Sequence, residues 1–309
     1  MEPHIEREPQ FDERIVFSSP LVRIGAFRCD RLHPSFPASA PIQHDCFWFS
    51  RTPVVIQPEA APAFVANQQS ATFYNRSAVY ARHPVGDHGD QSDWFGYDPD
   101  LLDEVLAHFP EPRRAGGRFP ISHCPVDGAT FLLQRQLFDA VALRPDVDPL
   151  AVEEVSLILL DRVLTQAIGY GDAGPRRRQH RELAIETERL LSRHFDRPLT
   201  LAAIGAHVGA SVFHLCRTFR RMTGSTLHQY LNRLRLRASL EQVSVSNSSL
   251  TEVALSLGFA NHSHFTKAFR AEFDQAPSAF RAARGLLPPL VWRPVAGDAG
   301  DAGGEPARR

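Results

Sequence analysis

The sequence predicts a two-domain α+β protein, with strands in the first half and helices in the second. Short aromatic and β-branched runs separated by Pro, Gly and Asp fill roughly the first 145 residues. Beyond them, apolar residues recur every three to four positions, which is the period of a helix. The charge also changes sign between the halves. A chain of 309 residues is long enough to give each domain its own core.

The first half has the composition of an all-β sandwich or small barrel. Four segments are rich in strand-forming residues: Phe47–Phe49, Pro53–Gln57, Ala71–Asn75 and Ala78–Arg82. The polar segment Asp87–Ser92 predicts a turn or loop ahead of Trp94.

Three helices are expected next, over residues 98–109, over residues 129–143, and from Asp148 onward. The third carries a broad apolar stripe that could pack on the barrel or on a second copy of the chain. The stripe consists of Val152, Val155, Leu159, Val163 and Ala167, with Leu160 and Leu164 beside it.

Glycines and a proline end this helix, and the composition sets the expected domain limits. We expect a first domain at residues 1–170, a linker at 171–179 and a helical domain at 180–285. Residues 286–309 are rich in Gly, Ala and Pro, which predicts a disordered tail.

The net charge of −1 conceals a strong asymmetry. From Met1 to Gly174, 14 Arg and no Lys stand against 24 acidic residues, a net charge of −10. From Pro175 to Gly285, 16 Arg and one Lys stand against 8 acidic residues, a net charge of +9. This asymmetry indicates a half that binds a polyanion joined to a half that does not. A basic half that is only a soluble surface would give the same count.

Several classes of protein are disfavoured. The longest apolar runs fall short of the ~18–20 residues that span a bilayer. The polar N-terminus resembles neither a signal nor a transit peptide, so we expect a cytoplasmic protein. The cysteines lack a C-x-x-C spacing and predict reduced thiols, with a redox-sensing pair as the alternative. They are Cys29, Cys46, Cys124 and Cys216.

An internal repeat in the basic half predicts two helix-turn-helix units, at about residues 199–224 and 249–274. Gly209 and Gly258 align at an offset of 49, whereas Leu215 and Phe265 align at an offset of 50. The second unit therefore has one more residue in its turn. A glycine there tolerates the left-handed backbone of a tight turn. In the second unit, Ser249 and Glu252 have the spacing of a capping box.

Each unit then shows a recognition helix with one apolar face. The predicted buried residues are Val212, Leu215, Phe219 and Met222 in the first unit, and Phe265, Ala268, Phe269 and Phe273 in the second. The predicted DNA-binding residues are Ser211, Phe213, Cys216, Arg217, Arg220 and Arg221, then Asn261, His262, Ser263, Thr266, Lys267 and Arg270. Arg, Lys and Asn can bond base edges, and Ser, Thr and further Arg can bond phosphates. An ordinary amphipathic surface helix is the alternative, and the doubled pattern favours DNA.

A helix over Leu227–Glu241 is expected to connect the units, since Leu227, Leu231, Leu234 and Ala238 form an apolar stripe. A stiff connector would fix the separation of the two recognition helices. Reading successive faces of the major groove needs a spacing of about 34 Å.

The stretch from about Leu199 to Arg281 resembles the DNA-binding domain of AraC/XylS-type bacterial regulators. The matching strings are Ser211–Gly224, Tyr230–Arg235 and Gly258–Arg270. By this resemblance, Phe213, Cys216 and Arg217 occupy the base-reading positions of the first unit. His262, Ser263, Thr266 and Lys267 occupy the corresponding positions of the second.

The resemblance also implies a cupin-like N-terminal barrel with flanking helices that binds an effector and often dimerises. The implied partners are double-stranded promoter DNA, a small-molecule effector, a second copy through the N-terminal domain and, for an activator, RNA polymerase in the bacterial nucleoid. An apolar effector pocket is one interpretation of a group of aromatic residues, and barrel core is the other. The group comprises Phe47, Phe49, Phe73, Tyr74 and Trp94.

We expect no catalytic residue, cofactor or metal. The histidines lack the close His-x-His pair and following Glu of cupin metal sites. They are His33, His44, His83, His88 and His123. Two alternatives to a specific regulator remain: a non-specific architectural DNA binder, and a metal-dependent cupin enzyme fused to a DNA-binding domain.

Overall fold

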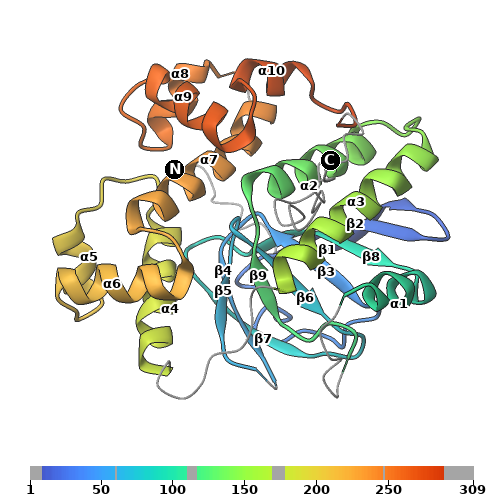
Figure 1. The fold of residues 1–309 in the computed structure, drawn as a ribbon, viewed down its shortest axis with the longest axis horizontal. Helices are drawn as coiled ribbons and strands as arrows, with labels where there is room; N and C mark the ends of the chain where they lie inside the picture. The colour runs from blue at the N-terminus through green and yellow to red at the C-terminus, as the bar shows by residue number, and fades with distance from the viewer. Residues whose placement is uncertain (1–8, 60, 110–116, 169–177, 246–247, 289–309) are drawn as a thin grey trace, which may run out of the picture.

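The computed structural model describes residues 9–59, 61–109, 117–168, 178–245 and 248–288. Strands and three helices form the N-terminal part, and helices alone form the C-terminal part (Figure 1). The predicted fold class is confirmed. The predicted linker at 171–179, except for the first two residues of α4, and the predicted tail beyond residue 288 lie outside the described residues.

The described strands form two antiparallel sheets. They are β1 Phe11–Ser18, β2 Val22–Cys29, β3 Cys46–Ser50, β4 Val54–Pro58, β5 Phe64–Ala66, β6 Ser70–Tyr74, β7 Tyr80–Pro84, β8 Asp90–Tyr97 and β9 His123–Pro125. The larger sheet has the order β1-β2-β8-β3-β6-β9, and the smaller has the order β5-β4-β7.

The four predicted strands are confirmed as β3, β4, β6 and β7, whereas β1, β2, β5 and β9 were not predicted. The loop predicted at Asp87–Ser92 is wrong from Asp90 onward, where β8 begins. The reason is that the polar side chains there are satisfied inside the fold. Asp90 is buried and accepts bonds from Arg82 Nη1 at 3.3 Å and from Ser92 Oγ at 2.9 Å.

The two sheets face each other across an apolar cluster that contains side chains from both. The larger sheet contributes Phe27, Trp48, Tyr74 and Trp94, and the smaller contributes Val54, Ile56, Phe64 and Tyr80. Neighbouring residues of β3 point to opposite faces, so Phe47 and Phe49 pack on the far side of the larger sheet.

That far side is covered by helices α2 (Gly128–Leu143) and α3 (Pro149–Ile168), while α1 (Pro99–Ala107) follows β8. Four stripe residues of α3, from Val152 to Val163, are buried in the same core cluster as Phe47 and Phe49. The stripe therefore packs on its own domain, which decides between the two partners left open by the sequence.

The C-terminal part consists of α4 Arg178–Arg193, α5 Leu201–His207, α6 Val212–Thr223, α7 Leu227–Val245, α8 Leu250–Ser256, α9 His262–Phe273 and α10 Pro277–Ala282. Helices α5 and α6 form the first helix-turn-helix unit, and α8 and α9 form the second. The predicted connector is α7, which runs between the units (Figure 1).

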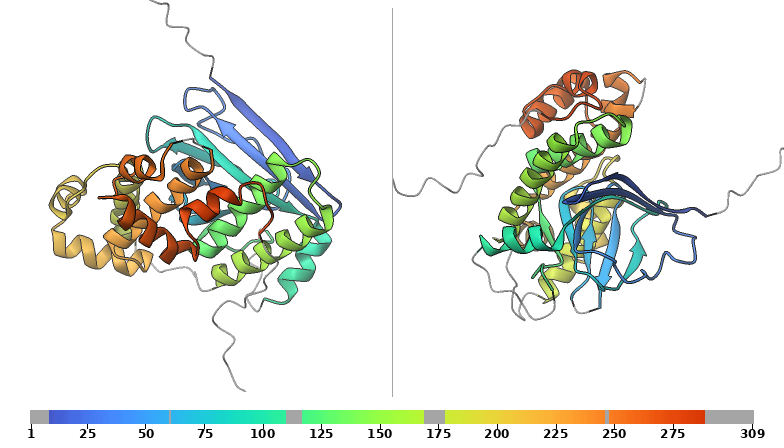
Figure 2. Two further views of the ribbon diagram at one scale, coloured as in Figure 1. Left: turned by 90° about the horizontal axis from the view of Figure 1, so that it is seen from above. Right: turned by 90° about the vertical axis from the view of Figure 1, so that its right-hand side faces the viewer.

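The two units have different cores. The first has a separate cluster that includes Leu191, Leu215 and Phe219. The core of the second, including Phe265 and Phe269, is continuous with the helix layer α2–α3. In the right view of Figure 2, α2 and α3 (green) lie between the sheets (blue) and the second unit (orange to red). The second unit is thus packed on the N-terminal domain.

Candidate DNA-binding interface

Both turns between the helices depend on a left-handed glycine. Residues 208–211 separate α5 from α6, and residues 257–261 separate α8 from α9. Gly209 has φ +65° and Gly258 has φ +79°, a conformation that side chains other than glycine rarely adopt. The predicted glycines and the extra residue in the second turn are confirmed.

Side-chain caps fix the start of the recognition helices α6 and α9. Ser211 Oγ accepts a bond from His214 N at 3.3 Å, and Asn261 Oδ1 accepts one from His264 N at 2.8 Å. Two predicted DNA-binding residues therefore also cap their helices. The predicted capping box between Ser249 and Glu252 is confirmed at the start of α8.

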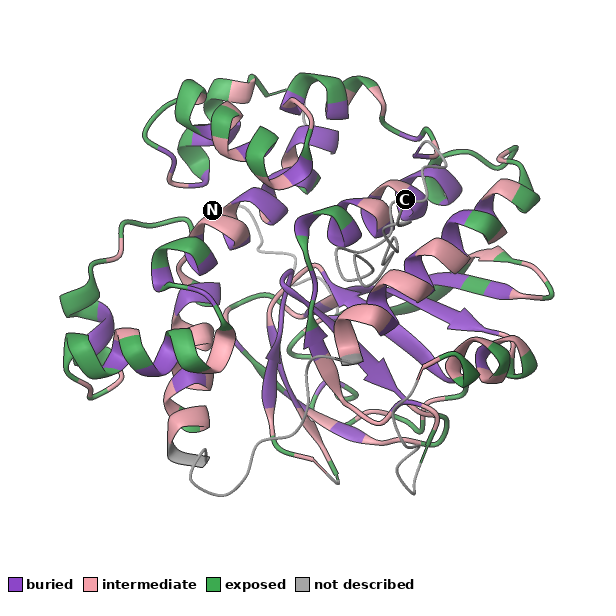
Figure 3. Cartoon of the chain, in the orientation of Figure 1, coloured by how far each residue is buried: buried purple, intermediate pink, exposed green. Residues whose placement is uncertain are grey.

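The outer face of α6 is basic and partly apolar. Arg217, Arg220 and Arg221 are exposed, Cys216 is half-buried, and the Phe213 side chain is 76% exposed. An exposed phenyl ring on a basic helix suits contact with a thymine methyl group. The exposed parts of α6 are green in Figure 3.

The inner face of α6 agrees with the prediction in part. Leu215 and Phe219 are buried, and Met222 is half-buried. The prediction that Val212 is buried is wrong, because this first residue of the helix is 40% exposed.

Helix α9 shows a more polar outer face. Ser263, Lys267 and Arg270 are exposed, whereas His262 and Thr266 are half-buried and lie 3.3 Å apart through Nε2 and Oγ1. Its inner face carries the buried Phe265, Phe269 and Phe273, with Ala268 half-buried. The structure thus places the predicted residues of each unit together, on one helix and its cap.

Much of the arginine in the basic half serves the fold rather than this outer face. Arg235 donates to the carbonyls of Phe195 at 2.6 Å and Arg197 at 3.0 Å. Arg281 donates to the Val243 carbonyl at 3.0 Å. The excess of +9 counted from the sequence therefore overstates the charge that is free to meet a polyanion.

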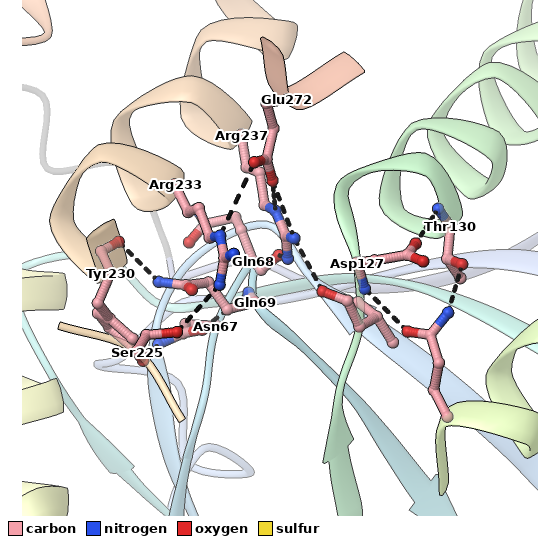
Figure 4. A network of polar contacts seen from close by, with 12 residues as sticks. Asn67, Gln68, Gln69, Asp127, Thr130, Ser225, Tyr230, Arg233, Arg237 and Glu272 are labelled. Carbon is pink, nitrogen blue, oxygen red and sulfur yellow. Dashed lines mark hydrogen bonds and ion pairs between the residues drawn. The ribbon is translucent and has the colours of Figure 1, made fainter. Parts of the chain in front are cut away.

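Arg237 of α7 joins the connector to three other segments (Figure 4). Its side chain is 1% exposed and donates to the Gln68 carbonyl at 2.8 Å and to the Val126 carbonyl at 2.8 Å. It also binds Glu272 of α9 at 3.1 Å. A buried guanidinium group is tolerated only when its donors are satisfied, so this contact fixes α7 and α9 against the N-terminal domain.

A second polar contact holds the start of α7. Asn67 Nδ2 donates to Tyr230 Oη at 2.8 Å and to Ser192 Oγ at 3.0 Å, and Gln69 Nε2 donates to the Tyr230 carbonyl at 2.9 Å. Tyr230 also bonds to the Glu188 carboxyl in α4. The segment from Asn67 to Gln69 thus binds two helices of the C-terminal domain.

Ionic contacts extend this interface. Glu241 of α7 lies 3.0 Å from Arg135 and 3.3 Å from Arg51, and Arg51 also pairs with the buried Asp93 at 2.8 Å. None of these interdomain residues was predicted as functional. The run of three amides Asn67-Gln68-Gln69 between two strands was the one sequence signal available.

The predicted aromatic pocket residues are all buried, on opposite faces of the larger sheet. Phe47, Phe49 and Phe73 lie in the helix-facing core, whereas Tyr74 and Trp94 lie between the sheets. Their assignment to an effector site stays a prediction.

Among residues that the structure describes, no group of three or more His, Cys, Asp or Glu could hold a metal ion. Likewise, no described helix is long and apolar enough to cross a membrane. Burial raises the pKa of Cys46 and of Cys124 to about 12, which opposes thiolate formation at these two cysteines.

A helix-turn-helix family model matches residues 204–283, a range that begins within α5 and includes the connector α7 and the second unit. The C-terminal domain is an AraC-type helix-turn-helix domain. The transcriptional activator RhaS of Escherichia fergusonii is 31% identical over 177 residues, or 56% of this chain. The regulatory protein SoxS of Salmonella typhimurium is 28% identical over 102 residues, or 33% of this chain and 95% of SoxS.

The chain matches only part of its longer relatives. It covers 62% of RhaS and 36% of the transcriptional regulator Rob of Salmonella typhimurium. A solved Chromobacterium violaceum regulator with an AraC-type DNA-binding domain is 27% identical over 34% of this chain and 94% of its own, with a TM-score of 0.33. ToxT from Vibrio cholerae is 11% identical over 84% of this chain and 97% of its own, with a TM-score of 0.34.

Replacing Arg237 should loosen the domain interface. Arg237→Met leaves two buried carbonyls without their donor and removes the shorter of two arginine contacts of Glu272, so the free energy of unfolding should fall by about 3–5 kcal/mol. Amide hydrogen exchange should rise around Asn67–Gln69. The control is Arg233→Met on the same helix, where the side chain is 43% exposed and lies farther from Glu272, at 3.8 Å. Equal losses of stability and equal exchange in both variants would contradict the assigned role.

The stability of the protein should depend on Glu188. Burial raises the pKa of this carboxyl from 4.5 to about 8, although the bond from Tyr230 opposes the shift. The folded state therefore binds the proton more tightly, and this stabilisation, complete below about pH 4.5, is lost as the pH rises through about 8. Glu188→Gln should flatten the fall in melting temperature over that range. An unchanged slope in Glu188→Gln would refute the prediction.

Proposed function

We propose that this protein is a sequence-specific DNA-binding transcription regulator, in which α6 and α9 enter successive faces of the major groove. One observation carries the proposal: two capped recognition helices expose basic and polar side chains and are joined by one continuous helix. The 19 residues of α7 span about 28 Å. This length is of the same order as one DNA turn of about 34 Å.

The 12 predicted residues are proposed to divide their roles. Phe213, Cys216 and Arg217 read bases from α6, and His262, Ser263, Thr266 and Lys267 do so from α9. The remaining arginines and the cap residues bind phosphates, which fix the register on the duplex. RhaS and SoxS are named as a transcriptional activator and a regulatory protein, which supports regulation as the outcome of binding.

The N-terminal domain, at about residues 1–170, is proposed to bind a small-molecule effector and to change the DNA affinity of the AraC-type domain. Support comes from the buried contacts of Arg237 and Tyr230. Through these contacts, a structural change in the N-terminal domain would alter the positions of α7 and α9. Association of two copies through this domain is part of the proposal and is open to a mass measurement in solution.

The decisive test is binding specificity at physiological salt. At ~150 mM salt the protein should bind a duplex from its own upstream region at least ~10³-fold more tightly than random DNA of equal length. Fluorescence anisotropy with labelled duplexes would measure both affinities. Equal affinities would remove the specific-regulator function and leave a non-specific architectural binder.

Two arginines of α6 should behave differently. Arg217→Ala should lose about 1–3 kcal/mol of binding free energy and relax the preference at one base position, because a base contact is removed. Arg220→Ala should weaken binding to all duplexes alike and lower the salt slope by about 1. Arg284→Ala, an exposed arginine beyond α10, serves as the control. The reverse assignment of phenotypes would overturn these roles.

A further inference from the structure

A pocket of about 200 Å³ opens at the end of the larger sheet, next to the start of α1. Residues 19–23, 43–45 and 96–99 form its walls, together with Arg76 and Arg118. None of the aromatic residues predicted to bind an effector lines it. Its lining is polar and includes three arginines, Arg23, Arg76 and Arg118.

The carboxylates of this pocket are already engaged by the protein. Asp45 is buried, and its two oxygens accept bonds from Arg76 N at 2.9 Å and from Arg118 Nη1 at 2.8 Å. Asp98 caps α1 by accepting bonds from the backbone N–H groups of Asp100 at 3.0 Å and Leu101 at 3.2 Å. Asp45 is thus paired with Arg118, whereas the charge of Asp98 is directed at the N-terminus of α1.

The arginines are neutralised unequally. Arg118 pairs with Asp45 and also with Asp103 at 2.9 Å. Within the described part of the chain, no carboxylate lies within ion-pair distance of the side chain of Arg23 or Arg76. Both arginines line the pocket and are exposed to solvent, without an ion-pair partner among those residues.

The histidine in the same wall is consistent with a positive local field. Arg23 Nη1 lies 2.8 Å from His44 Nε2, so the ring accepts this bond in its neutral form. Partial burial, followed by the charges of Arg23 and Arg76, lowers the pKa of His44. The side chain next to both arginines thus avoids a third positive charge.

We propose that this pocket binds a small organic oxyanion, whose carboxylate or phosphate group is held by Arg23 and Arg76. Guanidinium groups match the planar or forked arrangement of such oxygens and bind them in charge-assisted bonds. A neutral ligand would form no ion pair with either arginine. This proposal specifies that the effector is an anion. It rests on the proposed function only for the effect on DNA binding.

Tyr97 connects the pocket to helix α3. Tyr97 lines the pocket, is buried, and donates from its hydroxyl to the Ser156 carbonyl of α3 at 2.8 Å. Helix α3 packs on α2, and α2 contacts both α7 and α9. Helix α1 lies on the opposite side of the molecule from α6 (Figure 1), so an anion would act through this helix layer rather than by touching the first recognition helix.

Binding can be tested without DNA, by isothermal titration with sodium phosphate and with sodium acetate at constant ionic strength, against sodium chloride. The wild-type protein should bind at least one of the two anions, and the preferred anion distinguishes a phosphate from a carboxylate ligand. The double variant Arg23→Gln/Arg76→Gln should bind it at least ~10-fold more weakly. Arg28→Gln is the matched control, because Arg28 lies on the same strand but outside the pocket and pairs with Asp30.

No binding of either anion beyond chloride, or equal binding by the double variant, would overturn the proposal. Because DNA is absent, this result is independent of whether the protein recognises a promoter. In a second experiment, the bound anion should change the affinity for the upstream duplex several-fold, and Tyr97→Phe should bind the anion but lose that change. A change that persists in Tyr97→Phe would exclude the route through the bond from Tyr97 to Ser156.

Discussion

Arg237 lies where the connector helix, the recognition helix α9 and two segments of the N-terminal domain meet. Its guanidinium group is buried, and each of its contacts goes to a different part of the chain, from Gln68 to Val126 to Glu272. Because a buried cation must keep its acceptors, these parts cannot separate without a large loss of free energy. The position of the second helix-turn-helix unit depends on this constraint.

The two units are consequently held in different ways. The second shares a continuous core with the helix layer of the N-terminal domain, whereas the first has its own core. Asn67 and Gln69 connect the first unit to the N-terminal domain by polar contacts with Tyr230 and Ser192. In the proposed function, a change in the N-terminal domain alters the placement of one unit relative to the other, and this placement sets whether both units reach successive groove faces.

The arginines of the protein serve two purposes, which the charge of each half does not reveal. The basic half contains structural arginines such as Arg235 and Arg237 as well as exposed ones such as Arg217. A count along the sequence cannot distinguish them, because it does not record which arginines are buried. The proposed anion pocket shows the converse: Arg23 and Arg76 place positive charge in a half whose net charge is −10.

The sequence by itself determined the helix-turn-helix repeat, its left-handed glycines, the capping box and the outward residues of α6 and α9. These features are local, since they follow from the period of a helix and from the backbone freedom of glycine. Only the tertiary structure decided that α3 packs on its own domain, that Asp90 begins a strand, and that Arg237 and Asn67 join the domains. The contacts of Asn67 and Arg237 join residues more than a hundred positions apart in the sequence. No local sequence pattern specifies which acceptor a buried polar side chain will bind.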